Sequence, residues 1–177
     1  MSAFIVDGQI CRIRPISETD SLSELTELLH RAYKVLADMG LRFMATHQSV
    51  EETGKRVKKG SCFIAEIDSA IIGTITYYPP SVVRGSPWLN RHDVALFGQL
   101  AVEPRLQRRG IASRLVDHVE NVAHNDGAVE LALDTAEPAT HLIEWYAKLG
   151  YRFIEYVQWD VTNYRSVVMS KTVSAAK

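Results

Sequence analysis

The sequence predicts an α/β fold with a mixed, mostly antiparallel sheet of seven strands flanked by about four helices. Some segments alternate apolar and polar residues, as strands do, while others repeat apolar residues at helical spacing. Most of the strand segments follow one another directly, which predicts antiparallel hairpins. One pair is separated by a helix, which predicts a crossover between two parallel strands. Helices on both faces of a mixed sheet fit this order.

The first third of the chain predicts one strand and two helices. Alternation around Ile13 predicts a strand at 11–16, and leucines at helical spacing predict a helix at 22–39. Both helices begin with a capping box, in which a serine precedes a glutamate by three residues. These boxes are Ser21 with Glu24 and Ser49 with Glu52. The second box precedes a short polar helix at 50–59.

The rest of the chain predicts six strands and two helices. A turn at Asp68-Ser69-Ala70 joins strands 61–67 and 71–78 into a hairpin, and prolines and glycine over 79–93 predict a long loop. Each later helix has an apolar stripe and a glycine just past its end. The elements after the loop are strand 94–102, helix 111–126, strand 129–135, helix 140–149, and strands 152–159 and 166–173. We expect a single domain over residues 1–177.

The overall composition excludes several classes of function. Twenty basic and 21 acidic residues nearly cancel, so we expect neither nucleic acid nor an anionic membrane as a partner. No apolar run approaches the roughly 18 residues of a membrane span, and the N-terminal stretch lacks the pattern of a signal peptide. We therefore expect a cytoplasmic protein, in which Cys11 and Cys62 are buried, reduced thiols.

The stretch from Leu100 to Leu115, LAVEPRLQRRGIASRL, places arginines and a glycine where a helix begins. The first N–H groups of a helix have no partner within it and carry the positive end of its dipole, so such a start binds anions. Arg105 adds positive charge, and Gly110 lets a phosphate approach the backbone closely because it has no Cβ. The residues after Gly110 do not fit a P-loop, and the dinucleotide fingerprint needs two more glycines.

This stretch resembles the GNAT superfamily of acyl-CoA N-acyltransferases. The family fingerprint, Q/R-x-x-G-x-G/A at a helix start after a strand, is read here as Gln-Arg-Arg-Gly-Ile-Ala over residues 107–112. Downstream, WYAKLGYRF at residues 145–153 is similar to a second family segment. The order of the elements also matches over roughly the whole chain.

The resemblance implies a coenzyme A site between the fourth and fifth predicted strands, which should splay apart. The strand backbone that should pair with the pantetheine arm belongs to Leu100, Ala101 and Val102. The residues that should wrap the diphosphate are Gln107, Arg108, Arg109, Gly110, Ile111 and Ala112. Tyr146 matches the tyrosine that commonly protonates the departing thiolate. The acceptor side should be lined by Arg42, Phe43, Trp88 and His92.

The sequence departs from the family pattern at two positions. Gln99 stands near the place where many members have a glutamate base, and Ala139 stands where many have an asparagine. A primary ammonium group has a pKa of about 10.4, so the site must supply a base or lower that pKa. The candidate bases are His47, His92, Asp93 and Glu103, while Gln99 could position a water. The base is therefore left open.

The resemblance implies an N-acetyltransferase that transfers the acetyl group of acetyl-CoA to a primary amine by direct attack in a ternary complex, without a metal. A coenzyme A-binding regulatory module with little activity is the alternative, because Gln99 cannot accept a proton at neutral pH. The sequence does not identify the acceptor or the acyl length, and it leaves a homodimer open.

Overall fold

The computed structural model describes residues 2–82 and 85–173. The strands are β1 (Ser2–Val6), β2 (Gln9–Pro15), β3 (Ser61–Ile67), β4 (Ala70–Tyr78), β5 (Val94–Val102), β6 (Glu130–Ala136), β7 (Arg152–Gln158) and β8 (Arg165–Thr172). The helices are α1 (Leu22–Asp38), α2 (Val50–Lys59), α3 (Ile111–Asn125) and α4 (Thr140–Lys148), with short 3-10 turns at Met44–Thr46 and Pro104–Leu106. None of the helices in these two ranges is long and apolar enough to cross a bilayer.

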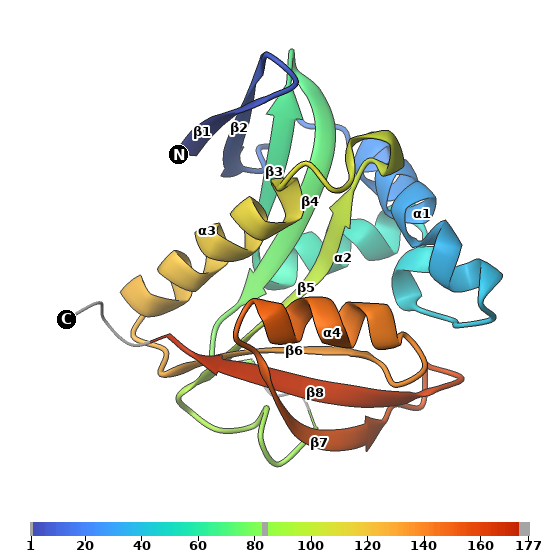
Figure 1. The fold of residues 1–177 in the computed structure, drawn as a ribbon, viewed down its shortest axis with the longest axis vertical. Coiled ribbons are helices and arrows are strands. Elements are labelled where there is room, and N and C mark those ends of the chain that lie inside the picture. The colour runs from blue at the N-terminus through green and yellow to red at the C-terminus, as the bar shows by residue number, and fades with distance from the viewer. Residues whose placement is uncertain (1, 83–84, 174–177) are drawn as a thin grey trace.

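The strands form one mixed sheet in the order β1-β2-β3-β4-β5-β6-β8-β7 (Figure 1). Among the described strands, only β5 and β6 pair in parallel, so the predicted fold class and the predicted crossover are confirmed. The predicted number of seven strands was wrong by one within the described residues, because β1 was missed. Asp7 and Gly8, with φ angles of 48° and 82°, form a two-residue turn that folds β1 back onto β2.

The two N-terminal helices begin at the predicted capping residues. The Ser21 hydroxyl accepts a hydrogen bond from the Glu24 N–H at 3.2 Å, and the Ser49 hydroxyl accepts one from the Glu52 N–H at 3.1 Å. Each bond satisfies one of the N–H groups that a helix start leaves without an intrahelical acceptor. The sequence therefore locates both helix starts correctly.

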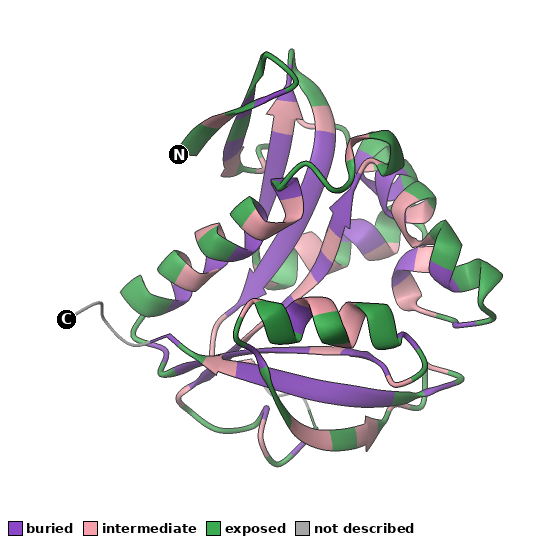
Figure 2. Ribbon diagram, in the orientation of Figure 1, coloured by how far each residue is buried: buried purple, intermediate pink, exposed green. Residues whose placement is uncertain are grey.

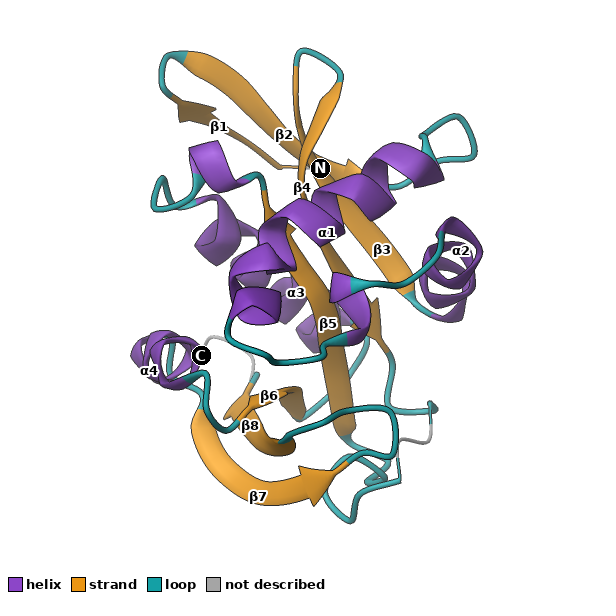
Figure 3. Cartoon of the chain, turned by 90° about the vertical axis from the view of Figure 1, so that its right-hand side faces the viewer, coloured by secondary structure: helices purple, strands orange, loops and turns teal. Residues whose placement is uncertain are grey.

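Helices cover both faces of the sheet (Figure 3). On one face, Ile111 and Leu115 of α3 pack with Phe63 of β3, and α4 adds Tyr146 to the same apolar cluster. On the other face, the leucines of α1 pack against Ile64 of β3. Successive residues of β3 point to opposite faces, so this central strand is buried on both sides (Figure 2).

Strands β5 and β6 separate partway along their length. They pair only between residues 94–96 and 130–132, although β5 continues to Val102 and β6 to Ala136. The separation follows a bulge in β5, where Gln99 and Leu100 together lie opposite Ile75 of β4. Gln99 has a φ of 53°, and a bulge of this kind bends its strand. The splay that the family resemblance implied is confirmed.

Both cysteines are buried and free, as predicted. Burial raises the pKa of the Cys11 thiol to about 11, and Glu66 adds to the rise. Burial also raises the pKa of Cys62. Thiols with raised pKa values are weak nucleophiles at neutral pH, so both side chains act as small core residues.

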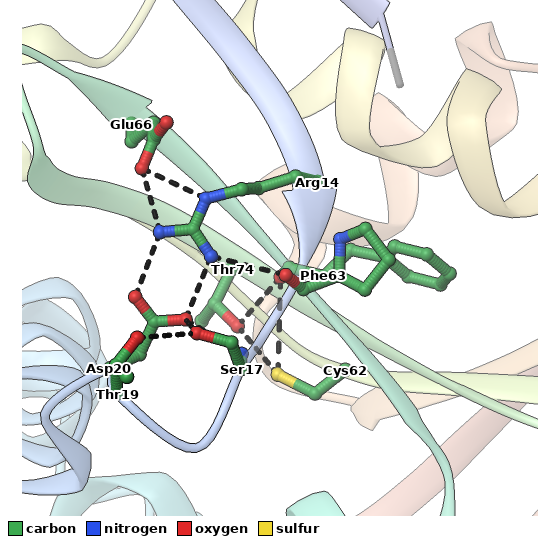
Figure 4. A network of polar contacts seen from close by, with 9 residues as sticks. Arg14, Ser17, Thr19, Asp20, Cys62, Phe63, Glu66 and Thr74 are labelled. Atoms are coloured by element: carbon green, nitrogen blue, oxygen red, sulfur yellow. Dashed lines mark hydrogen bonds and ion pairs between the residues drawn. The ribbon is translucent and has the colours of Figure 1, made fainter.

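An ion-pair network ties the segment before α1 to the sheet (Figure 4). Arg14 of β2 donates two hydrogen bonds to Asp20, at 2.7 and 2.8 Å, and two to Glu66 of β3, at 3.0 and 2.8 Å. Asp20 also accepts bonds from the backbone N–H and hydroxyl of Ser17. The Arg14 guanidinium holds the pKa of Asp20 well below its usual range. The network therefore fixes where α1 leaves the sheet.

We expect Asp20→Asn to lower the free energy of unfolding by about 1–3 kcal/mol at pH 7, because charge-assisted hydrogen bonds are lost from a mostly buried group. Urea unfolding measures the change. Asp38→Asn is the matched control and should cost less than about 0.5 kcal/mol, since its pair with Lys34 is exposed on both sides.

The pH dependence of this difference has a definite sign. The folded-state pKa of Asp20 is depressed, so its stabilisation is complete above the unfolded pKa of about 3.9 and is lost as the pH falls below it. The gap between wild type and Asp20→Asn should persist at pH 5 and narrow only under strongly acidic conditions. A gap that closes by pH 5 would contradict this account.

Candidate functional site

The gap between β5 and β6 opens into a cavity of about 730 Å³. Its walls come from the end of β5, the start of α3, the outer half of β6, one side of α4, and α1 together with Phe43. All of the predicted coenzyme A residues line it except Arg109. The structure thus brings together strand and turn residues that the sequence analysis grouped by resemblance.

The turn before α3 presents unpaired backbone donors at one end of this cavity. Gly110 is the N-cap of α3, with a φ of 81° and no side-chain cap, and Arg108 also has a positive φ of 62°. No described residue accepts a hydrogen bond from the N–H groups of residues 108–113. A Cβ at Gly110 would meet no described atom within 4 Å, so the space beside it is open. This turn is suited to a phosphate group.

Two side chains fix the turn against the sheet. The Gln107 side-chain amide donates to the Val102 carbonyl at 3.3 Å, which ties the turn to the end of β5. Arg109 points away from the cavity and forms an ion pair with Asp7 in the β1–β2 turn. Arg109 therefore contributes positive charge at a distance, while Arg108 lines the cavity itself.

A second, smaller cavity of about 210 Å³ adjoins the first. The residues that line both cavities are Tyr33, Phe43, Leu100, Asp134 and Tyr146. The two spaces therefore meet at one point beside the bulge of β5. A long ligand in the larger cavity and a small one in the other would have their ends next to each other there.

Tyr146 stands at this junction. It lies on α4 and is 8% exposed, and its ring packs beside those of Trp145 at 4.8 Å and Phe97 at 6.1 Å between centroids. Burial raises its pKa above the usual value for tyrosine, and Tyr33 and Asp134 add to the rise. No described residue hydrogen-bonds to its hydroxyl, so a protonated O–H is available to a ligand at the junction.

The family follows from a match over most of the chain. Residues 22–151 match the model of the acetyltransferase (GNAT) family. This chain belongs to the GNAT family. It is 31% identical over 142 residues to S-(2-succino)cysteine N-acetyltransferase of Bacillus subtilis, covering 79% of this chain and 83% of that protein.

Solved structures share the fold at lower identity. The GNAT domain of S. lividans PAT has a TM-score of 0.72 at 20% identity, covering 97% of this chain and 96% of that domain. A GNAT acetyltransferase from Elizabethkingia anophelis, solved with acetyl-CoA bound, has a TM-score of 0.65 at 18% identity, covering 92% of this chain and 97% of that one. Proteins of the GNAT family thus bind acetyl-CoA, and this chain has their fold.

Gln99, near the position of the glutamate base in many GNAT proteins, is held by a buried polar network. Its carbonyl oxygen accepts from the Gln48 amide at 3.0 Å, and its own amide donates to the Thr76 hydroxyl at 3.4 Å. The same Gln48 amide donates to the Thr53 hydroxyl at 2.7 Å, which also accepts from Thr26 at 2.8 Å. Gln99 is 4% exposed, so its side chain acts in the fold and holds the bulge.

The candidate bases lie away from the junction. His47, His92, Asp93 and Glu103 line neither cavity. Glu103 pairs with Arg31 at 2.9 Å. Hydrogen bonds from Arg91 lower the pKa of Asp93, which makes it a weaker base.

The predicted acceptor residues are divided by the structure. Phe43 lines both cavities. The preceding residue, Arg42, is exposed, and its backbone N–H donates to the side-chain oxygen of Asn163 at 2.8 Å. Arg42, Trp88 and His92 line neither cavity. The Trp88 ring packs in a separate apolar cluster with Leu89 and lies 4.3 Å from the guanidinium of Arg91. The long loop therefore places Trp88 and His92 away from the junction.

Two charged residues at the smaller cavity were missed in the sequence analysis. Asp134 of β6 accepts hydrogen bonds from the Trp159 indole at 3.0 Å and the Ser166 hydroxyl at 3.1 Å. Arg56 of α2 donates to the Gln48 side-chain oxygen at 2.8 Å. An acid inside the apolar strand VELALDT was a usable signal for Asp134. Within residues 2–82 and 85–173, no group of three or more His, Cys, Asp or Glu could hold a metal ion.

We expect Thr53→Val to lower the free energy of unfolding by about 0.5–1.5 kcal/mol, because the Gln48 amide loses one of its two acceptors and the Thr26 hydroxyl keeps only the Leu22 carbonyl. Thr135→Val is the matched control, since the buried Thr135 hydroxyl has no partner among the described residues. Its removal should be neutral or slightly stabilising. Thermal or urea unfolding compares them, and equal losses would show that the network contributes nothing of its own.

Proposed function

We propose that this GNAT protein transfers the acetyl group of acetyl-CoA to the primary amine of a small acceptor, by direct attack in a ternary complex. The junction of the two cavities at Tyr146 is the observation that carries this proposal. A cosubstrate in the larger cavity and an acceptor in the smaller one would meet there without an acyl-enzyme intermediate. The acceptor of the Bacillus subtilis relative, S-(2-succino)cysteine, is also a small amine.

The walls of the larger cavity suit two parts of acetyl-CoA, the diphosphate and the pantetheine arm. We assign the diphosphate to the turn at 107–112, where the unpaired N–H groups and Arg108 supply positive potential. The splayed end of β5, from Leu100 to Val102, has no strand partner on the β6 side and can pair with the pantetheine amides. These contacts would aim the thioester at the junction.

Residues at the junction can account for both proton movements. The amine attacks the thioester carbon, the C–S bond breaks, and the sulfur needs a proton while the nitrogen must lose one. Burial keeps Tyr146 protonated, so it can donate to the departing sulfur. Asp134 is the acidic residue shared by both cavities, and we assign it the role of attracting the amine and receiving its proton, directly or through water.

The coenzyme A-binding module is the second candidate, favoured by Gln99, whose amide is occupied by Gln48 and Thr76. Free thiol release from acetyl-CoA, followed over a broad panel of amines, separates the two. Tight acetyl-CoA binding without thiol release would favour the module. A cytoplasmic location, a homodimer, and the absence of nucleic-acid and membrane partners stay predictions.

Tyr146→Phe should lower kcat about 10²–10⁴-fold with little change in acetyl-CoA affinity, because only the proton donor is removed. Initial rates of thiol release and calorimetry measure the two quantities. Tyr151→Phe is the control: this neighbouring buried tyrosine donates to Glu120 and should retain most of the activity. Unchanged turnover in Tyr146→Phe would remove this residue from the mechanism.

Gly110→Ala should weaken coenzyme A binding at least about tenfold, since the new methyl group enters the space assigned to the diphosphate. Gly127→Ala is closely matched, because both glycines have a φ of 81° and neither Cβ would meet a described atom within 4 Å. Both variants should lose about 1–2 kcal/mol of stability from the left-handed backbone. Calorimetric titration with coenzyme A should separate them, and equal affinities would place the diphosphate elsewhere.

A further inference from the structure

The smaller cavity has opposite charges on its two sides. Arg56 approaches from α2 and is tied through Gln48 to the β5 side of the gap, whereas Asp134 belongs to β6. Both charges act on Tyr33, which also lines the cavity: burial raises its pKa to about 12, Arg56 opposes the rise and Asp134 adds to it. Among the described residues that line the cavity, Arg56 is therefore the one cation and Asp134 the one anion.

Arg56 is a half-buried cation without a carboxylate partner among the described residues. Its one hydrogen bond to a described group goes to the neutral Gln48 side chain. Arg14, Arg91 and Arg152, in contrast, each pair with an aspartate or glutamate. A guanidinium has five N–H donors arranged to bind a carboxylate with two parallel bonds. Most of the donors of Arg56 are left for a ligand.

We propose that the acceptor is a free α-amino acid or a close derivative, whose carboxylate binds Arg56 while its amine lies between Asp134 and Tyr146. This assignment rests on the proposed acetyl transfer. In an α-amino acid the ammonium and the carboxylate are held one carbon apart, so one small molecule offers an opposite charge to both Arg56 and Asp134. A polyamine or a protein N-terminus has an amine for Asp134 but no carboxylate beside it for Arg56.

The size and the remaining walls of the cavity agree with this class. A volume of about 210 Å³ suits one small molecule. Apolar side chains complete the lining and can contact the side chain of the amino acid. They include Phe43, Met44, Phe97 and Val161.

The test compares each of the twenty common L-amino acids with its own carboxamide, alongside spermidine and a short peptide with a free N-terminus. Thiol release from acetyl-CoA gives kcat/KM for every acceptor. The carboxamide keeps the size and the α-amine and removes only the negative charge. Its amine is also less basic, so its intrinsic reactivity at neutral pH is higher. We expect the best amino acid to exceed its carboxamide by about 10- to 100-fold.

Arg56→Gln should reduce this preference to near unity, mainly by raising KM for the amino acid, with little change for the carboxamide. Lys59→Gln is the matched control, because it removes the same charge from an exposed position of the same helix. Arg56→Lys should keep part of the preference. A purely structural role of Arg56 would lower both members of each pair equally and leave their ratio unchanged, which would overturn the assignment.

The remaining outcomes separate this inference from the function on which it rests. Acetylation of spermidine, the peptide or the carboxamides at rates equal to or above those of the amino acids would overturn the amino-acid acceptor and leave acetyl transfer intact. Acetyl-CoA binding without thiol release from any acceptor would overturn the proposed function, and the acceptor class with it.

Discussion

The site depends on one backbone constraint, the bulge of β5 at Gln99. A buried residue other than glycine adopts a left-handed conformation there, which costs of order 1–3 kcal/mol unless neighbouring contacts enforce it. The contacts with Gln48 and Thr76 supply that enforcement. The bulge lies where β5 runs apart from β6: the β5 backbone beyond residue 96 is unpaired on that side, and both cavities open along this edge.

The network that holds the bulge also reaches the acceptor side. Gln48 accepts from Arg56 with its oxygen and donates to Gln99 and Thr53 with its amide, so α2, β5 and the cavity lining are parts of one hydrogen-bonded unit. Such networks rigidify their surroundings when every member is satisfied. A glutamine at position 99 is therefore consistent with the proposed roles, in which β5 shapes the site and Asp134 of β6 accepts the proton of the amine.

The fold was largely predictable because its signals are local. The capping boxes place the starts of α1 and α2, and the mostly apolar run VALFGQLAV gives β5 its observed bounds. The missed strand β1 also had a local signal in Asp7-Gly8, a dipeptide typical of tight hairpin turns. The bulge had none. Phe97 and Val102 pack in the same cluster although strict alternation would place them on opposite faces, and only contacts distant in sequence produce that shift.

The two parts of the candidate site differ in the same way. The turn at 107–112 is contiguous, so its residue types and spacing can be recognised from the sequence alone. Arg56 could not be singled out, because it stands among Lys55, Lys58 and Lys59 on a helix that reads as uniformly polar. Arg56 differs from these lysines because it lines the smaller cavity. Phe97 and Tyr164 line the same cavity, and Gln48 holds the Arg56 side chain, so the arrangement depends on segments far apart in the chain. In the proposed assignment, acceptor choice depends on that assembly, whereas the position of the cosubstrate depends on one short motif.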